Sequence, residues 1–208
     1  FRSREVFHVS GPITNTTFYN NTVYLGPHLS DIIIIYHKSW GGYPDRTSYY
    51  NNIIYNQASS TRYSFGSSTN NIFYYNVFYG NHPSSEPNDP HKLTSDPMLV
   101  DPGSAGLGIN TVDGYKLKPG SPCIDSGKFI EGSGGRDYWG GQVPYNATDR
   151  GAHEYGSTID VRSPDQASHL PANFVLHQNF PNPFNCSTNI RFDLNQDAHV
   201  SLSIYTID

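Results

Sequence analysis

A short motif of aromatic, asparagine and aliphatic residues occurs three times in the first 80 residues of the chain. The copies are FYNNTVY at residues 18–24, YYNNIIY at residues 49–55 and FYYNVFY at residues 73–79, at offsets of 31 and 24 residues. Another apolar strand candidate, DIIIIY at residues 31–36, lies between the first two copies. Short strands that return at such an interval are typical of a solenoid. The repeat therefore predicts a coil of stacked parallel strands, and an antiparallel sandwich is the alternative.

The equivalent positions of the repeat predict which side chains lie above one another. We call one turn of the coil a rung, and rungs are expected about 4.8 Å apart. One column consists of amides that can form a hydrogen-bonded ladder: Asn21, Asn52 and Asn76. Another column is expected to form an aromatic stack: Tyr24, Tyr55 and Tyr79. Two further columns adjoin each other, so one is expected to face inward and the other outward: Thr22, Ile53 and Val77, and Val23, Ile54 and Phe78.

Composition supports an all-β chain. There are 16 tyrosines, 19 glycines and 15 prolines but only one methionine, which suits strands and turns better than helices. The runs of two asparagines followed by hydrophobic residues resemble the right-handed parallel β-helix proteins. That resemblance implies a right-handed parallel β-helix over residues 1–90.

The repeat ends before residue 91, and turn-forming residues become frequent. Because an open strand edge invites aggregation, we expect residues 91–156 to cover the end of the coil. Four stretches resemble the terminal module of many bacterial β-helix proteins: DPMLVDP at 96–102, YKLKPGSPCIDSG at 115–127, RDYWG at 136–140 and DRGAHEY at 149–155. This resemblance implies a cap and leaves the chemistry of the protein open.

The cap segment contains four carboxylates beside glycine-rich turns: Asp125, Asp137, Asp149 and Glu154. We expect each of them to cap its own turn by accepting backbone N–H groups, with Arg136 or Arg150 neutralising the charge. The alternative is that Asp125, Asp137 and Asp149 bind calcium, a cation that prefers oxygen ligands.

The end of the chain suggests a second domain. Residues 157–172 have the small, polar composition of a linker, and FPNPFN at residues 180–185 must be extended because of its prolines. Alternating strands are expected over residues 189–194 and 200–205. Residues 173–208 resemble the opening of the C-terminal sorting domain of type IX secretion, a small β-sandwich, with Cys186 at a position that is usually proline. The resemblance implies a bacterial protein that is secreted or displayed on the outer cell surface.

Further expectations follow from the same features. The resemblance implies that residues 173–208 are recognised by the secretion machinery. Since no leader follows Phe1 and the chain stops at Asp208, we predict a piece of a larger secreted protein. A net charge of −5 argues against nucleic acid or anionic membranes as partners, and the longest apolar run, residues 32–35, is too short to span a bilayer. Cys123 and Cys186 are expected to be separate thiols, and an interdomain disulfide is the alternative.

Bacterial β-helix proteins often act on polysaccharides, so the resemblance implies a carbohydrate ligand or substrate. A polysaccharide lyase needs a base and a cation, for which the candidates are His37, Lys38 and Arg46; the alternative is an ordinary solvated loop. A glycoside hydrolase needs two carboxylates, and Asp31 and Asp45 are available without a supporting motif. Two aromatic residues in a glycine loop are candidate sugar contacts: Trp40 and Tyr43. A carbohydrate-active enzyme and a non-catalytic surface or adhesive protein both remain open.

Overall fold

The computed structural model describes residues 4–104, 106, 111–157, 175–176, 180–185, 187–189 and 192–193. The chain divides into two compact units, Phe1–Ile159 and Asp160–Asp208. The described residues contain strands and turns, and their helical residues are limited to short 3₁₀ turns, at Thr111 and at Asp113–Tyr115. The prediction of an all-β chain is confirmed.

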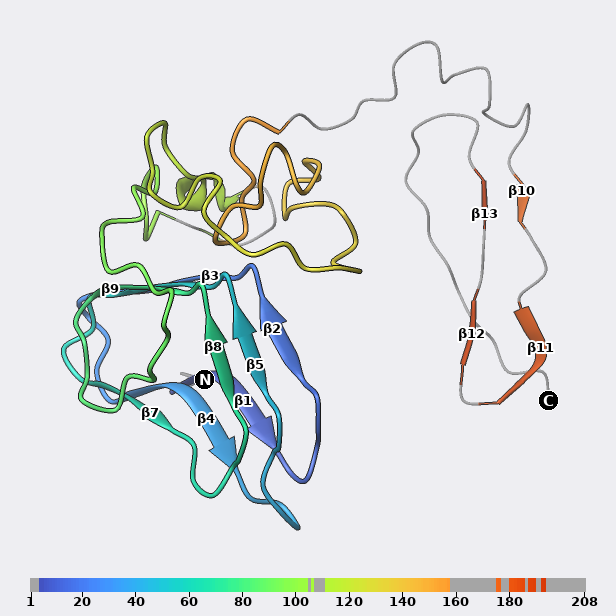
Figure 1. Cartoon of the computed structure of the whole chain (residues 1–208), viewed down its shortest axis with the longest axis horizontal. Helices are drawn as coiled ribbons and strands as arrows, with labels where there is room; N and C mark the ends of the chain where they lie inside the picture. The colour runs from blue at the N-terminus through green and yellow to red at the C-terminus, as the bar shows by residue number, and fades with distance from the viewer. Residues whose placement is uncertain are drawn as a thin grey trace. The chain divides into compact units, whose positions relative to one another are not determined.

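The first unit begins with three passes of the chain, each of which contributes three strands. The first pass comprises β1 (Glu5–Ser10), β2 (Thr17–Tyr19) and β3 (Thr22–Leu25). The second comprises β4 (Ile32–Lys38), β5 (Ser48–Tyr50) and β6 (Ile53–Asn56), and the third β7 (Thr61–Ser64), β8 (Ile72–Tyr74) and β9 (Val77–Gly80). The strands form three parallel sheets in the orders β1-β4-β7, β2-β5-β8 and β3-β6-β9 (Figure 1). This arrangement is compatible with a parallel β-helix, and we refer to the nine strands as the coil.

The register confirms the predicted alignment of the repeats. Thr22 pairs with Ile53 and Ile53 with Val77, so the preceding asparagines are stacked. The Nδ2 group of Asn21 donates to Oδ1 of Asn52 at 2.8 Å, and Nδ2 of Asn52 donates to Oδ1 of Asn76 at 2.9 Å. The ladder ends where Nδ2 of Asn76 donates to Oδ2 of Asp89 at 2.9 Å.

The interior of the coil is filled by columns of equivalent residues. Phe18, Tyr49 and Phe73 stack inside it, with centroid separations of 5.2 and 4.8 Å between neighbouring rings. Ile54 and Phe78 belong to the same core, against which Val23 packs, so this is the predicted inward column. The predicted tyrosine stack is also present, with centroids 5.2 and 4.7 Å apart and the rings tilted or edge-on: Tyr24, Tyr55 and Tyr79.

The two apolar members of the outward column are not exposed to solvent. Ile53 and Val77 are completely buried and pack against Leu99, Leu117 and Cys123. Both faces of the β3-β6-β9 sheet are therefore covered, which explains why the two neighbouring columns are both mainly apolar.

The covering segment, residues 97–157, is called the flank segment below. The sequence predicted that residues 91–156 cover the open edge of the coil, but only the part around Leu93 pairs there, with Val77 of β9. The flank segment instead contacts every rung from outside: Ala152 N donates to Thr22 Oγ1, Gly151 N to Asn51 O, and Arg150 Nη1 to Asn76 O. It lies against the outer face because apolar area there needs burial.

The second unit contains two antiparallel strand pairs. Strand β10 (Val175–Leu176) pairs with β13 (Phe192–Asp193), and β11 (Phe180–Asn185) pairs with β12 (Ser187–Asn189). The FPNPFN stretch is thus extended, as predicted. Its ladder has residue pairs only at its two ends, Phe180 with Asn189 and Asn185 with Ser187, and the two prolines between them have no N–H to donate. The linker, Cys186 and the strand predicted over 200–205 lie outside the described residues.

Candidate functional site

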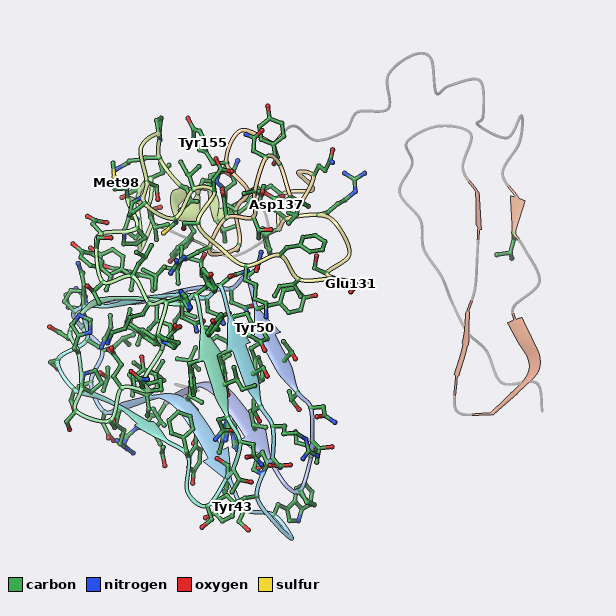
Figure 2. All side chains as sticks on the ribbon, in the orientation of Figure 1. Tyr43, Tyr50, Met98, Glu131, Asp137 and Tyr155 are labelled. Carbon is green, nitrogen blue, oxygen red and sulfur yellow. The ribbon has the colours of Figure 1, made fainter. Side chains whose placement is uncertain are left out.

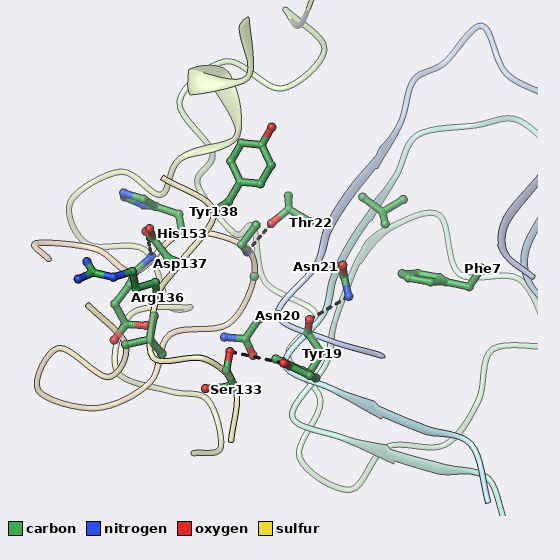
Figure 3. Close-up of a pocket in the computed structure, with 15 residues that line it drawn as sticks. Phe7, Tyr19, Asn20, Asn21, Thr22, Ser133, Arg136, Asp137, Tyr138 and His153 are labelled. Atoms are coloured by element: carbon green, nitrogen blue, oxygen red, sulfur yellow. Dashed lines mark hydrogen bonds between the residues drawn. The ribbon is translucent and has the colours of Figure 1, made fainter. Parts of the chain in front are cut away.

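A cavity of about 490 Å³ lies between the first rung and the flank segment (Figure 3). Its coil side is lined by Tyr19, Asn20, Asn21 and Thr22. Its flank side is lined by Arg136, Asp137, Tyr138 and His153. The lining also includes apolar side chains, Phe7, Val23 and Val143. An apolar lining with a few polar groups is the usual composition of a ligand site.

The corner between β2 and β3 positions the coil side of the cavity. Asn20 has a φ of 52°, a left-handed conformation that asparagine tolerates better than most residues. Its Oδ1 accepts a hydrogen bond from Nδ2 of Asn51 at 3.0 Å, which ties the corner to the next rung. The hydroxyl of Tyr19 reaches across the cavity and donates to the carbonyl of Ser133 at 3.5 Å.

On the flank side, Asp137 organises the loop that carries the other lining residues. Its Oδ1 accepts N–H groups from Trp139 and Gly141 at 2.9 and 2.6 Å, and its Oδ2 accepts the N–H of Glu154 at 3.0 Å. Neighbouring Arg136 donates only to the carbonyl of Gly140 among the described residues, at 2.7 Å. The guanidinium therefore keeps donors available for a ligand.

Two further side chains on this side differ in what they can offer. Tyr138 is half exposed, so its ring and hydroxyl are accessible. His153 Nδ1 accepts the N–H of Leu117 at 3.0 Å, which places the ring proton on Nε2. Burial lowers the pKa of His153, so its ring is neutral.

A column of tyrosines continues from the cavity over the outer face of the β2-β5-β8 sheet. Tyr19, Tyr50 and Tyr74 occupy equivalent positions in this sheet and alternate with the inward rings. Lys128 Nζ lies 4.7 Å from the centroid of the Tyr50 ring and 5.7 Å from that of Tyr74. We call these three tyrosines the tyrosine face; Tyr50 is labelled in Figure 2. Tyr19 belongs to both the cavity and the face, which makes one continuous surface.

The sequence interpretation did not identify the tyrosine face. The signal was present, because each aligned copy of the repeat has an aromatic residue followed by tyrosine: Phe18-Tyr19, Tyr49-Tyr50 and Phe73-Tyr74. Alternation in a strand directs the two members of each pair to opposite faces.

The three candidate lyase residues are not brought together. His37 is 1% exposed and lies within the coil, where its ring nitrogens contact Ser68 Oγ at 2.8 Å and the Tyr49 hydroxyl at 2.9 Å. Burial lowers the pKa of His37 to about 4. Lys38 follows it in β4 and is exposed, while Arg46 forms an ion pair with its neighbour Asp45.

The two candidate hydrolase carboxylates belong to separate networks. Asp31 is paired with Arg4 and Arg62, and hydrogen bonding and charge from Arg62 chiefly lower its pKa. Asp45 accepts hydrogen bonds from Thr69 and Asn70, besides its contact with Arg46.

The candidate sugar-binding loop lies outside the cavity lining. Trp40 is 82% exposed, and Tyr43 packs over Gly66, where a Cβ atom would lie 2.3 Å from the tyrosine ring. Tyr43 precedes β5, whereas Tyr50 ends it, so the loop and the tyrosine face lie at opposite ends of the strand (Figure 2).

The three carboxylates proposed as calcium ligands and the fourth carboxylate, Glu154, all accept backbone N–H groups. Asp137 was described above. Asp125 Oδ1 accepts the N–H of Ala147, and Asp149 accepts the N–H groups of Asp125 and Tyr155. Glu154 accepts the N–H groups of Tyr145 and Asp149. Asp137 caps its own turn as expected, whereas Asp125, Asp149 and Glu154 accept N–H groups from residues at least five positions away. Within the described residues there is no group of three or more His, Cys, Asp or Glu side chains suited to a metal ion.

The expected arginine neutralisation does not occur. Arg150 donates to Ser126, to the carbonyl of Asn76 and to that of His91. Burial raises the pKa of Asp149 to about 6 and that of Glu154 to about 7. Cys123 is a free, buried thiol whose pKa is raised to about 11 by burial.

Comparison with known proteins adds no family to this description. No protein-family model matches the chain, and no curated protein matches it. The part of the chain that the structure describes holds no helix with the length and hydrophobicity needed to cross a bilayer. The function is therefore inferred from the geometry of the site.

Proposed function

We propose that the chain is part of a bacterial protein that binds polysaccharide through the cavity and the tyrosine face. The observation that carries this proposal is the continuity of the two through Tyr19. Adjacent strands place successive tyrosines about 4.8 Å apart, which gives an extended aromatic surface. The flat, apolar faces of sugar rings stack on such surfaces, while tyrosine hydroxyls bind sugar hydroxyls.

The polar groups around this surface suit a chain of sugars. Arg136 and the half-exposed Tyr138 supply donors in the cavity, and Lys128 lies over the rings of Tyr50 and Tyr74. One end or branch of a polysaccharide would occupy the cavity, and the following units would lie on the tyrosine face.

Binding without cleavage is the function that this geometry supports best. The cavity and the face bring stacking and hydrogen-bonding groups together, whereas His37 faces the interior and Arg46 is engaged by Asp45. We therefore favour a secreted or surface-displayed binding protein over a lyase or hydrolase.

A substitution in the middle of the face tests the proposal. Tyr50→Ala is expected to weaken binding to a responsive polysaccharide about tenfold, measured by affinity electrophoresis and calorimetry. Tyr36→Ala is the matched control, because Tyr36 is a half-buried tyrosine of β4 that contacts His8 and belongs to another sheet. Equal binding by the wild type and Tyr50→Ala would disprove this role. Release of unsaturated uronates or reducing ends by the wild type would instead show an enzyme.

We further propose that the coil is a right-handed β-helix and that residues 173–208 direct export through type IX secretion. Crossovers between parallel strands are overwhelmingly right-handed, which supports the first part. The FPNPFN stretch and its extended conformation support the second. Deletion of residues 173–208 from the full-length protein should stop export and leave the coil folded. If the shortened protein still reached the medium, the proposed role of residues 173–208 in export would be wrong.

A further inference from the structure

A second cavity, of about 310 Å³, opens at the ends of strands β6 and β9. We propose that it binds one neutral sugar unit, either a free hexose or the end of a glycan chain. Its lining includes Tyr55, Gln57, Tyr79, Asn81, His82 and Thr94. The volume is at the lower end of the range for ligand sites, which fits a small ligand.

One wall of this cavity is aromatic and held in place before any ligand arrives. Tyr55 and Tyr79 are half-buried members of the tyrosine stack, with ring centroids 4.7 Å apart. The side chain of Gln57 fixes the stack from the side: its Oε1 accepts the hydroxyl of Tyr24, and its Nε2 donates to the hydroxyl of Tyr55, both at 2.9 Å. A preorganised wall reduces the entropy lost on binding.

The opposite rim is positioned by a tight turn after β9. Gly80 has a φ of 96°, and a Cβ atom on it would lie 2.2 Å from the carbonyl oxygen of Asn56. Only glycine permits this approach. The turn is fastened by Asn56, whose Nδ2 donates to the carbonyl of Asn81 at 2.8 Å. Asn81 and His82 are thereby placed at the cavity.

The polar atoms left over at this rim are mainly acceptors. His82 Nδ1 lies 2.7 Å from a carboxylate oxygen of Glu86, which can only accept, so Nδ1 carries a proton; in the tautomer protonated at Nδ1 alone, Nε2 is an acceptor. Asn81 Nδ2 donates to the carbonyl of Ala58 at 2.9 Å, which leaves its Oδ1 as an acceptor. The hydroxyl of Thr94 has no partner among the described residues and can donate or accept.

This set of groups selects a ligand with many hydroxyl groups. Sugar hydroxyls can donate to Asn81 Oδ1 and His82 Nε2, while the ring stacks on Tyr79. None of the residues that line the cavity is Lys or Arg, and nearby Lys92 is already paired with the Glu86 carboxylate at 3.0 Å, so the lining supplies no cation for an anionic ligand. The chemistry therefore favours a neutral sugar over a uronate or a sulfated sugar.

The two cavities are separate, since they share no lining residue. The first adjoins the start of β3, and the second adjoins the ends of β6 and β9. A chain carrying both sites should bind two sugar ligands independently, and a long glycan could gain affinity by engaging both.

Amide NMR of the whole chain tests the second site. The neutral ligands are glucose, galactose, mannose and xylose, and each is compared with its uronic acid or with a uronate polymer fragment. A neutral sugar is expected to shift the signals of residues 80–82 and 94. Tyr79→Leu keeps apolar packing but removes the ring, and His82→Ala removes an acceptor; each should weaken this binding about tenfold. His28→Ala is the control, because His28 is exposed and does not line the cavity.

The result for the second site can be distinguished from the result for the first cavity and the tyrosine face. Shifts at residues 80–82 that persist in Tyr50→Ala would support a second site whether or not the tyrosine face binds. Preferential shifts with uronates would overturn the neutral ligand class. Signals that stay unmoved with every sugar, while Tyr19 or Tyr138 responds, would overturn the second site and leave the proposed function intact.

Discussion

The coil and the flank segment are stabilised in different ways. In the coil, one set of contacts is repeated from rung to rung, with parallel ladders and stacked interior rings. In the described part of the flank segment, the regular structure is limited to short 3₁₀ turns and isolated bridges, and carboxylates accept backbone N–H groups. The coil therefore gains stability by repetition, and the flank segment by contacts that each occur once.

Asparagine and aspartate show the same difference at the level of single atoms. An amide both donates and accepts, so Asn52 can continue the ladder in both directions. A carboxylate only accepts, so Asp89 ends the ladder at the third rung. Four carboxylates of the flank segment also act only as acceptors, here of backbone N–H groups: Asp125, Asp137, Asp149 and Glu154.

The largest effect is expected from a cavity in the repeated core. Phe78 is 2% exposed and contacts the coil interior, where its ring lies 6.1 Å from that of Tyr63. Phe78→Ala should lower the free energy of unfolding by about 3–5 kcal/mol. Urea denaturation measures the change, and Phe129→Ala is the control because Phe129 is 58% exposed in the flank segment. Equal losses in the two variants would show that the coil is not the main source of stability.

A substitution at the contact between the coil and the flank segment should cost less stability than one in the coil core. Gly151 has a φ of 95°, and a Cβ atom there would lie 2.5 Å from Ile53 Cδ1 and 2.8 Å from Thr22 Oγ1. Gly151→Ala should therefore cost about 1–3 kcal/mol through strain and displacement of the flank segment. Amide hydrogen exchange should increase at residues 148–155 and change little in β4 and β5. Faster exchange throughout the coil would mean that the two regions unfold as one unit.

Buried titratable groups of the coil and of the flank segment should change the free energy of unfolding in opposite directions as the pH rises. Burial lowers the pKa of His37 from 6.5 to about 4, so the folded coil binds fewer protons than the unfolded chain in this range. The contribution of His37 to the free energy of unfolding is complete above pH 6.5 and is lost as the pH falls towards 4. In the flank segment the pKa of Glu154 rises from 4.5 to about 7 and that of Asp149 from 3.8 to about 6. Their contribution is present at low pH and is lost as the pH rises.

His37→Gln isolates the flank segment, because glutamine keeps hydrogen-bonding capacity but does not titrate. Between pH 5 and pH 7 the wild type should gain about 2 kcal/mol from His37 that the variant lacks. The variant should therefore lose stability over this interval. Urea titrations at both pH values, with NMR titration of His37, measure the difference. A variant that gained stability as steeply as the wild type would refute the assignment to His37.

The repeat allowed much of the coil to be predicted from sequence. Equivalent positions share an environment, so the positions of Asn21, Asn52 and Asn76 predicted the ladder that the structure contains. The flank segment has no such repetition. Its place against the outer face depends on contacts between residues far apart in sequence, such as Ala152 with Thr22.

The candidate site was less predictable for a local reason. Strand β4 begins with four consecutive isoleucines, and an irregularity in its pairing with β7 falls between Ile33 and Ile35. Alternation therefore could not establish which of His37 and Lys38 faces inward. The partners that hold His37 inside, Ser68 and Tyr49, come from other parts of the coil. The cavity beside Tyr19 likewise requires the position of the flank segment.

The smallest effect is expected at Trp40, whose loop belongs to neither the coil interior nor the flank segment. Because Trp40 is 82% exposed, Trp40→Ala should leave the midpoint of urea denaturation unchanged. The loop that holds Trp40 and Tyr43 lies at the other end of β5 from Tyr50. A long polysaccharide can reach both places, whereas a short oligosaccharide reaches only one. Trp40→Ala should thus weaken binding of long chains by about 0.5–1 kcal/mol and leave the affinity of short ones unchanged, as calorimetry over a series of chain lengths would show. An equal loss for every length would place the principal sugar contact at Trp40 and not on the tyrosine face.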